Sequence, residues 1–388
     1  MSVDLWQRLR DRPELVAAAA EAGGPPLKVQ KRLRKAFEAD LVPLALSLAE
    51  CRRKAAGRFS YADRLWTDSV RLEQATPEAV ARHKATRFDA ATTDLCSGFG
   101  SDAVAIAAGQ PVTAVDLDPV CRLFNEWNAE AVGVSVAAKS GDATRHPPDG
   151  LIHIDPDRRA AGRRVRRLEQ YAPPLDFLQR LTMTADGGAI KVSPASNFGG
   201  KFDGCEVELI SHGGECREAT VWFGRLAGGP PSRATVLTGA GAETIAGDPL
   251  DAVAEAAELV EGGYLLDPDP SLVRSGLLDV WCDRHGVKRL DDAEEYLFAD
   301  RVPDSAMASP FRFVAETANN DRAIRSMLQS HDVGPLEAKT RHVGTDANAL
   351  QKRFRGDGTE RGVLFLARVA GRTRAVLARR CDAAGEPV

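Results

Sequence analysis

Carboxylates and glycines follow one another at spacings typical of a nucleotide-binding crevice. Asp94 lies in a short strand-like run that enters a Gly-rich turn at 98–100. A helix is expected after the turn, capped by Ser101 or Asp102, and the next apolar run ends on Asp116. A strand, a Gly-rich turn, a helix and a second strand tipped by a carboxylate predict a ligand site above the turn.

Two classes of ligand use such a crevice. The run GFGSDA at 98–103 fits the GxGxxG/A pattern of dinucleotide binders, in which glycines let the backbone approach a pyrophosphate. Asp94 precedes the first glycine by four residues, where a dinucleotide-binding strand is usually apolar. A carboxylate there suits a cationic ligand better than a pyrophosphate. The later motif Asp155-Pro156 also argues against a dinucleotide.

These motifs resemble, in order and spacing, the first four motifs of class I S-adenosylmethionine-dependent methyltransferases, over about residues 88–226. The resemblance implies S-adenosyl-L-methionine as the cofactor. It places the first acid near the methionine end, the Gly turn against the cofactor, the second acid on the ribose hydroxyls and the third on the adenine amine. The cofactor-binding residues expected are Asp94, Cys96, Gly98, Gly100, Asp116 and Asp142. Cys96 replaces the usual glycine, which should narrow the turn without closing it.

The whole chain also resembles a bacterial family of methyltransferase-like proteins that end in a THUMP-like domain. The resemblance is carried by RLEQAT at 71–76, DPDRR at 155–159 and LLDPDPSLVRSGLLD at 265–279. The core is similar to that of trimethylguanosine synthases.

The motif DPDRR follows the fourth expected strand and resembles the DPPY motif of amino-methylating enzymes. In that motif the acid and the next backbone carbonyl orient a target nitrogen, which implies catalytic roles for Asp155, Pro156, Asp157 and Arg158. Asp157 and Arg158 replace the usual proline and aromatic ring, and a guanidinium can instead stack on a base or clamp a phosphate. Alternatively, Asp155 caps the strand end and pairs with Arg158 or Arg159.

Six arginines lie within 158–167, and no acid interrupts them between Asp157 and Glu169. Such a run is often a solvated helix face, but its place beside the expected catalytic loop predicts a phosphate-binding strip. Lys191 ends an apolar strand and either faces the pocket or extends from the strand edge into solvent. The substrate-binding residues expected are Arg159, Arg163, Arg164 and Lys191. His153 is expected to be a packed strand residue, and Cys96 or Cys121 is the less favoured choice of a nucleophile.

The composition limits the class of protein. The chain has 388 residues, a formal net charge of −4 and 44% apolar residues, so a nucleic-acid surface would have to be local. Its seven scattered cysteines form no CxxC motif, which favours reduced thiols in a cytoplasmic compartment and no structural metal. No signal-peptide core and no apolar run of membrane-spanning length are present, so we expect no membrane association.

Alternating strands and helices predict an α/β fold built on a Rossmann-like class I methyltransferase sheet. Four parts are expected: a helical N-terminal region, the methyltransferase domain, a linker with a small acidic α+β segment that could be ferredoxin-like, and a basic THUMP-like α+β domain of βαβαββ order. Their boundaries are 1–87, 88–226, 227–308 and 309–382, and 248–300 is the acidic stretch.

Our first interpretation is a methyltransferase that acts on RNA, with direct displacement of the methyl group by a nucleobase nitrogen. The partner would be RNA, bound in part by the basic C-terminal domain. Two alternatives stay open. One is a small-molecule or protein methyltransferase whose last domain serves assembly. The other is an RNA-binding protein whose methyltransferase fold has lost activity, which the unusual DPDRR motif suggests. The sequence does not indicate the oligomeric state.

Overall fold

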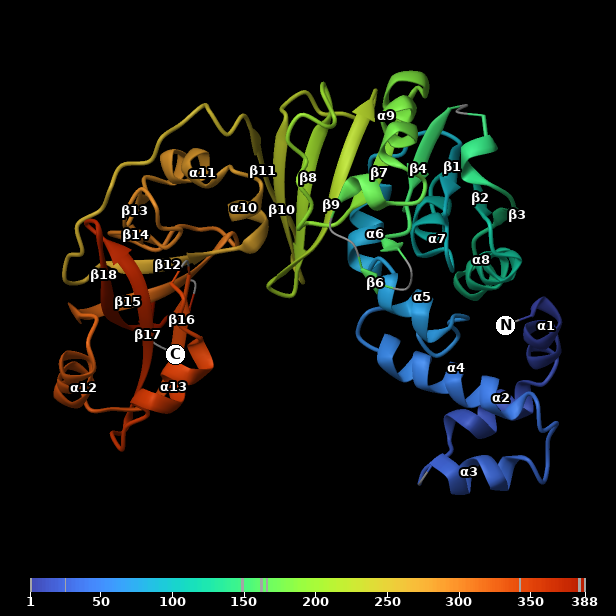
Figure 1. Cartoon of the computed structure of the whole chain (residues 1–388), viewed down its shortest axis with the longest axis horizontal. Coiled ribbons are helices and arrows are strands. Elements are labelled where there is room, and N and C mark those ends of the chain that lie inside the picture. Colours follow the sequence, from blue (N-terminus) through green and yellow to red (C-terminus); the bar gives the residue numbers. More distant parts are fainter. Residues whose placement is uncertain are drawn as a thin grey trace. The chain divides into compact units, whose positions relative to one another are not determined.

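A computed structural model describes residues 2–24, 26–147, 150–160, 163–164, 167–341, 343–382 and 385–386 (Figure 1). At 159–160 and 163–164 the description covers the backbone only. The predicted strip at 158–167 therefore lies partly outside the described residues, since Arg166 is not described and the side chains of Arg159, Arg163 and Arg164 are not. The chain forms two compact units, 1–207 with 217–229 and 208–216 with 230–388.

The helical character expected of the N-terminal region is confirmed. The helices described before the first strand are α1 (Val3–Arg10), α2 (Pro13–Ala20), α3 (Pro26–Leu33), α4 (Val42–Ala55), α5 (Ser69–Gln74) and α6 (Glu78–Ala85). The first four share one apolar core with α8 (Pro119–Val132). Trp6 packs edge-on against Phe124 at a ring distance of 4.8 Å, and Trp66 against Trp127 at 4.9 Å. These helices are thus built onto the nucleotide-binding layer rather than folded apart from it.

The sheet of the first unit has the order β9-β7-β4-β1-β2-β3. Its parallel strands are β1 (Thr92–Leu95), β2 (Val112–Asp116), β3 (Val136–Ser140), β4 (Leu151–Ile154) and β7 (Gly187–Val192), and β9 (Glu215–Gly224) runs antiparallel to β7. The helices α7 (Ser101–Ala107), α8 and α9 (Leu175–Thr184) complete the βα units, and β5 (Arg159–Ala160) pairs with β6 (Arg163–Arg164). The predicted class I methyltransferase sheet is confirmed, and it includes the antiparallel strand β9.

The central strands are apolar on both faces because helices cover both sides of the sheet. Every residue of β4 and β7 is buried. At Gly188 a Cβ atom would lie 2.0 Å from the carbonyl oxygen of Ile152, so only glycine fits between these strands. The sheet therefore brings the carboxyl ends of β1, β2 and β4 to one edge, where Asp94, Asp116 and Asp155 lie.

The second unit holds two groups of strands. Strand β8 (Glu206–His212) lies next to β10 (Ser232–Thr238), which forms an antiparallel hairpin with β11 (Gly241–Gly247). The other sheet has the order β13-β14-β12-β15-β18-β17-β16. Its strands are β12 (Tyr264–Pro268), β13 (Lys288–Arg289), β14 (Leu297–Ala299), β15 (Ala308–Ala318), β16 (Val333–Thr340), β17 (Glu360–Val369) and β18 (Arg372–Arg380). The helices are α10 (Pro270–Arg274), α11 (Leu278–His285), α12 (Asp321–Ser330) and α13 (Ala347–Phe354).

The acidic segment and the last domain belong to one sheet. Strand β12 pairs antiparallel with β15, and the order β15-α12-β16-α13-β17-β18 is the predicted βαβαββ order. Asp267 at the end of β12 lies 2.8 Å from both Lys339 and Arg341. Part of the acidic stretch thus neutralises cations of the last domain. The finer division of the chain at residue 308 stays a prediction.

Candidate active site

A cavity of about 710 Å³ lies at the carboxyl ends of β1, β2 and β4. Its lining combines residues from 68–76, 94–102, 115–121, 141–144, 155–158 and 172–174. Among the described lining residues, eight are aspartates and two are arginines: Asp68, Asp94, Asp102, Asp116, Asp118, Asp142, Asp155 and Asp157, with Arg71 and Arg158. Such an excess of carboxylates suits a cationic ligand and opposes a pyrophosphate.

The structure brings most of the predicted site residues together at this cavity. Asp94, Cys96, Gly98, Asp116, Asp142, Asp155, Pro156, Asp157 and Arg158 line it. Gly100 does not, and its glycine is required for another reason: its φ is +91°, and a Cβ would lie 2.5 Å from the side-chain oxygen of Asn125. The expected cap by Ser101 or Asp102 is wrong. Gly100 precedes α7 as its N-cap, and both polar side chains turn inward to Thr76.

The turn after β1 is left-handed at Cys96 and Gly98, each with φ of 56°. A Cβ in this region costs about 1 kcal/mol, so glycine would be less strained at Cys96. The amide of Asn125 donates hydrogen bonds to the carbonyl of Gly98 at 3.0 Å and of Cys121 at 2.9 Å, which fixes the turn against α8. Cys96 is one of the residues that line the cavity.

The Asp116 carboxylate is held by the backbone on both oxygens. The N–H groups of Gly98 and Asp118 donate to Oδ2 and Oδ1, each at 2.9 Å. Burial raises the pKa of this carboxyl, and the two N–H donors oppose that rise. Each oxygen keeps a further lone pair, an arrangement that could accept hydrogen bonds from two vicinal hydroxyl groups. The next residue, Leu117, is 74% exposed and lines the cavity, so it offers an apolar face to a flat ring.

Asp142 follows β3 and lines the cavity, as do Val115 and Leu117. Its Oδ1 accepts hydrogen bonds from the Thr144 N–H at 2.9 Å and hydroxyl at 2.8 Å. The Thr144 hydroxyl and N–H hold the pKa of this carboxyl below its usual range. The side chain is therefore an ionised acceptor that could reach an amino group at the far end of a bound ligand.

The loop after β4 is held by an ion pair that the sequence analysis did not predict. Asp155 keeps 26% of its side chain exposed, and its Oδ2 accepts from the Lys191 ammonium at 2.7 Å. Among the described side chains, Asp155 therefore pairs with Lys191 and not with an arginine of its own motif, which was the alternative interpretation. Lys191 is 4% exposed, so it does not extend into solvent. It is not itself among the lining residues, but its ammonium contacts Asp155 and Gln74, which are, and its role in substrate binding stays a prediction.

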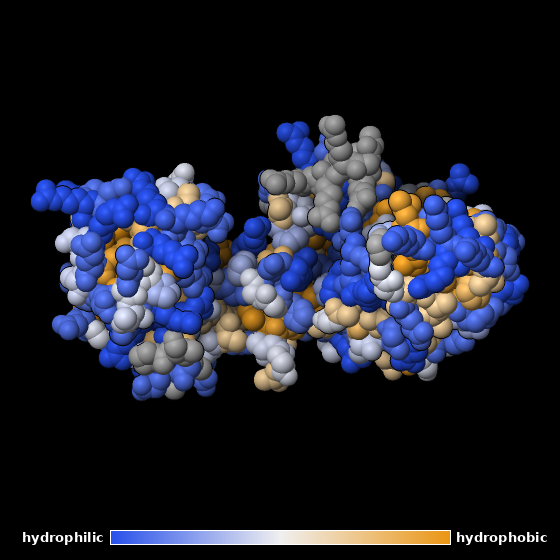
Figure 2. Space-filling model, turned by 90° about the horizontal axis from the view of Figure 1, so that it is seen from below, coloured by the Kyte–Doolittle hydropathy of each residue, from blue (hydrophilic) through white to orange (hydrophobic). Residues whose placement is uncertain are grey.

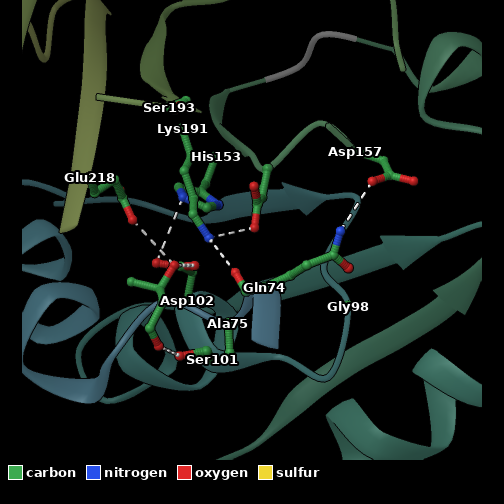
Figure 3. A network of polar contacts seen from close by, with 12 residues as sticks. Gln74, Ala75, Gly98, Ser101, Asp102, His153, Asp157, Lys191, Ser193 and Glu218 are labelled. Atoms are coloured by element: carbon green, nitrogen blue, oxygen red, sulfur yellow. Dashed lines mark hydrogen bonds and ion pairs between the residues drawn. The ribbon is translucent and has the colours of Figure 1, made fainter. Parts of the chain in front are cut away.

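Residues 68–76 line part of the cavity. The resemblance at RLEQAT pointed to this segment, but none of its residues was among the predicted site residues. Arg71 pairs with Asp68 and with Asp118, next to the Asp116 carboxylate. The Gln74 amide donates to the Asp157 carboxylate at 3.2 Å, and the Gln74 carbonyl accepts from Lys191 at 3.2 Å (Figure 3). The motif RLEQAT therefore contacts both Asp118, which follows β2, and the DPDRR loop.

Behind the cavity lies a buried cluster of ionisable side chains. Lys84 of α6 is 1% exposed, and its ammonium lies 2.8 Å from Asp102 and 2.6 Å from Glu218. His153 lies 3.2 Å from Lys84 through Nε2 and 2.6 Å from Asp94 through Nδ1. His153 is buried as predicted, but it has ionic partners that the sequence did not reveal. Burial lowers the pKa of His153, and the Asp102 and Asp94 carboxylates raise it above its ordinary value.

The predicted arginine strip and the two candidate cysteine nucleophiles have different outcomes. Arg158 lines the cavity, whereas Arg167 lies at a separate hollow of about 400 Å³ with Lys201 and Asn197. Burial raises the pKa of the Cys96 and Cys121 thiols, which opposes a nucleophilic thiolate.

Within the described ranges, no group of three or more His, Cys, Asp or Glu side chains is arranged to hold a metal ion. No helix in the described part of the chain is long and apolar enough to cross a membrane.

Comparison with known proteins defines the class. The chain belongs to the S-adenosylmethionine-dependent methyltransferases, because it is 32% identical over 346 residues to two such enzymes, themselves uncharacterised, from Mycobacterium tuberculosis strains CDC 1551 and H37Rv. The match covers 85% of this chain and 94% of each relative. Residues 308–380 match the family described as THUMP domain-like. The similarity to trimethylguanosine synthases stays a prediction.

The fold has a solved counterpart. A crystal structure of a candidate methyltransferase from Porphyromonas gingivalis W83 superposes with a TM-score of 0.75 over 95% of this chain and 99% of the other, at 15% sequence identity. At that identity the likeness concerns the fold alone. The activity and the cofactor follow from the closer relatives: the protein is an enzyme, and its cofactor is S-adenosyl-L-methionine.

The residues present fit this cofactor. The double acceptor at Asp116 suits a ribose diol, the exposed Leu117 suits an adenine ring, and the carboxylate excess suits a sulfonium and an ammonium group. When bound, the cofactor supplies an electrophilic methyl group. The chain's own part is to orient the methyl acceptor and exclude water.

Proposed function

We propose that this enzyme methylates a nucleobase nitrogen of RNA. The observation that carries the proposal is the positive charge of the THUMP-like residues, since 308–380 contain fourteen Lys and Arg against seven Asp and Glu. Phosphates are the ligands that such a surplus attracts most generally. Hydrophilic side chains cover most of the face of the second unit seen in Figure 2. A cytoplasmic location is part of this proposal.

The basic surface is smaller than the sequence predicts, because many of its cations are paired. Lys339 and Arg341 bind Asp267, Arg353 binds Asp321, Arg374 binds Glu316, and Arg379 and Arg380 bind Glu360 and Glu337. Among the Lys and Arg residues of 308–380, those that are exposed and have no ion-pair partner among the described residues are Arg312, Arg322, Arg325, Lys352, Arg355, Arg361 and Arg372. Lys352, Arg355 and Arg361 lie where α13 leads into β17, which makes this end our candidate for phosphate contact.

The catalytic loop supports a nitrogen acceptor. Asp155 has one oxygen held by Lys191, and the other can accept from an N–H group at the cavity. As the nitrogen bonds to the methyl group, its N–H becomes more acidic and a nearby carboxylate stabilises the developing positive charge. No aromatic side chain occurs in the described part of the DPDRR loop, so Arg158 is the flat group available there to stack on a base.

The acidic cavity also favours a second candidate function, methylation of a cationic small molecule or of a basic protein side chain. The eight lining aspartates would attract such an acceptor, and the THUMP-like domain would then serve assembly. An enzyme of this kind would bind RNA weakly and would label protein or small metabolites instead. The third possibility, loss of activity, predicts cofactor binding without transfer to any fraction.

Neutralising the free cations at the end of α13 should weaken RNA binding. In the variant Lys352→Gln/Arg355→Gln/Arg361→Gln, the log–log slope of affinity against salt should fall by about 2 units, since each phosphate on a single strand contributes roughly 0.7. The cofactor cavity lies wholly in the first unit, so affinity for S-adenosylhomocysteine should not change. Filter binding of total RNA from low to moderate salt measures the slope. Substitution is preferable to deletion of the domain, because deletion would expose the edge of β12.

A charge-matched variant in the first unit provides the control. Lys31 and Arg32 of α3 and Lys35 in the turn after it are exposed cations, and their replacement by Gln removes the same charge. This control should leave the salt slope unchanged. An equal loss of slope in both variants, or a flat salt response from the intact enzyme, would contradict RNA recognition by the THUMP-like domain.

A further inference from the structure

A chain of contacts links the N-terminal helical region to both acids of the DPDRR loop. The Lys191 ammonium donates to the Asp155 carboxylate at 2.7 Å and to the Gln74 carbonyl at 3.2 Å. The Gln74 side-chain amide donates in turn to the Asp157 carboxylate at 3.2 Å. Figure 3 shows Gln74 with its carbonyl directed toward Lys191 and its amide toward Asp157. Lys191 and Gln74 are called the brace of this loop below.

Strand pairing places Lys191 next to Asp155. Ile154 and Ile190 are register partners on the parallel strands β4 and β7, and the next residues of the two segments are Asp155 and Lys191. Lys191 is buried and does not line the cavity, whereas Asp155 is partly exposed and does. A buried ammonium is costly without partners, so its two oxygen contacts fix where it lies. Lys191 therefore acts on the cavity through the residues that it contacts.

Gln74 is held in place independently of the loop. It is the last residue of α5, and the Arg58 guanidinium donates to the carbonyls of Leu72 and Ala75 at 3.2 and 3.1 Å. These bonds fix the chain on both sides of Gln74. A carboxylate accepts hydrogen bonds, so the Gln74 amide must direct its nitrogen, and not its oxygen, at Asp157. The third residue of the DPDRR motif is thus tied to the helical region.

We propose that Lys191 and Gln74 are positioning residues, which fix the orientation of Asp155 and Asp157 toward the methyl acceptor. This inference rests on the proposed function in one respect, because it takes Asp155 as the group that meets the acceptor nitrogen. A carboxylate stabilises developing charge only from the right place, and a displacement of about 1 Å can cost on the order of 100-fold in rate. The N-terminal helical region is therefore part of the methyl-transfer site, and Lys191 serves the acceptor without contacting it.

Lys191→Met removes the ammonium and keeps an unbranched side chain. The kcat for methyl transfer should fall roughly 10- to 100-fold, while the acceptor KM and the affinity for S-adenosylhomocysteine stay within about twofold. Lys339→Met is the matched control, since Lys339 pairs with Asp267 at 2.8 Å in the second unit, and its kcat should not change. A higher KM at an unchanged kcat would overturn the positioning role and support the predicted contact of Lys191 with substrate.

Gln74→Glu tests the other half of the brace and serves if Lys191→Met does not fold. The change keeps the shape of the side chain but sets two carboxylates against each other, so kcat should fall roughly tenfold. Adding Asp157→Asn should restore most of that loss, because the amide introduced at 157 can donate to the carboxylate introduced at 74. A role of Gln74 in folding alone predicts no such rescue. An unchanged kcat in Gln74→Glu, or a double variant slower than either single variant, would overturn the inference.

The assay separates this inference from the choice of substrate. Transfer of tritium from labelled S-adenosyl-L-methionine is followed in the RNA, protein and small-molecule fractions of a cell extract. The ratio of variant to unaltered kcat is then taken in the fraction that the unaltered enzyme labels. Label in protein or small molecules would contradict methylation of RNA, while the kcat ratios would still test the brace. No transfer to any fraction by the unaltered enzyme would overturn both proposals.

Discussion

Replacement of Asp155 by Asn is expected to lower kcat by on the order of 10²–10⁴-fold while the affinity for S-adenosylhomocysteine stays within about twofold. The carboxylate contributes when the acceptor N–H becomes acidic, which happens only as the methyl group moves. Asparagine can still accept from Lys191, so the loop should keep its position. Transfer of label from tritiated cofactor into RNA measures kcat, and calorimetry measures cofactor affinity.

Asp176→Asn is the control for removal of a carboxylate near this sheet. Asp176 is exposed, pairs with Arg180 one turn along α9 and does not line the cavity, so activity should be unchanged. An equal loss of turnover and cofactor affinity in Asp155→Asn would contradict a transition-state role. It would indicate instead that the Asp155–Lys191 pair only fixes the end of β4.

Replacement of Asp116 by Ala should weaken S-adenosylhomocysteine binding by about 3 kcal/mol, or roughly 100-fold. The change removes the acceptor for two ligand hydroxyls and leaves the N–H groups of Gly98 and Asp118 without their partner. The increase in Tm that the ligand causes in the unaltered protein should largely disappear, because that increase depends on occupancy. Calorimetry and thermal unfolding with and without ligand measure both effects.

A modified ligand distinguishes a loss of hydroxyl recognition from a general loss of ligand binding. The unaltered protein should prefer S-adenosylhomocysteine to its 2′-deoxy analogue, and Asp116→Ala should abolish that preference. Asp89→Asn, at an exposed acid paired with Arg225, should keep it. If Asp116→Ala still distinguished the two ligands, another group would have to bind the ribose.

The elements that hold the site were predictable because their signals are local. The acids at the ends of β1 and β2 and the turn at 98–100 stand within short apolar runs that already specify buried parallel strands. The βαβαββ order of the last domain was predictable for the same reason. The relation of β15 to β12 was not, because strand pairing between separate segments leaves no local pattern.

The groups that tune the site were missed because they meet only after folding. Thr76 and Glu218 lie 142 positions apart and share a hydrogen bond behind the cavity. Lys191 was ambiguous because its partner Asp155 comes from the neighbouring strand β4, 36 positions earlier. Likewise, Lys339 counts as a free cation in the sequence, although Asp267, 72 positions earlier, neutralises it. Counts of charge therefore predicted the sign of each region but not which charges remain available.

The most direct test of the account is transfer of tritium from labelled S-adenosyl-L-methionine by the purified enzyme to RNA extracted from a strain that lacks the gene. Nucleoside mass spectrometry then identifies the product. The account predicts label in RNA, in a nucleoside methylated on a base nitrogen, and none when Asp155→Asn replaces the enzyme at equal cofactor occupancy. Label that appears only in protein or small molecules, or no label in any fraction despite cofactor binding, would contradict it.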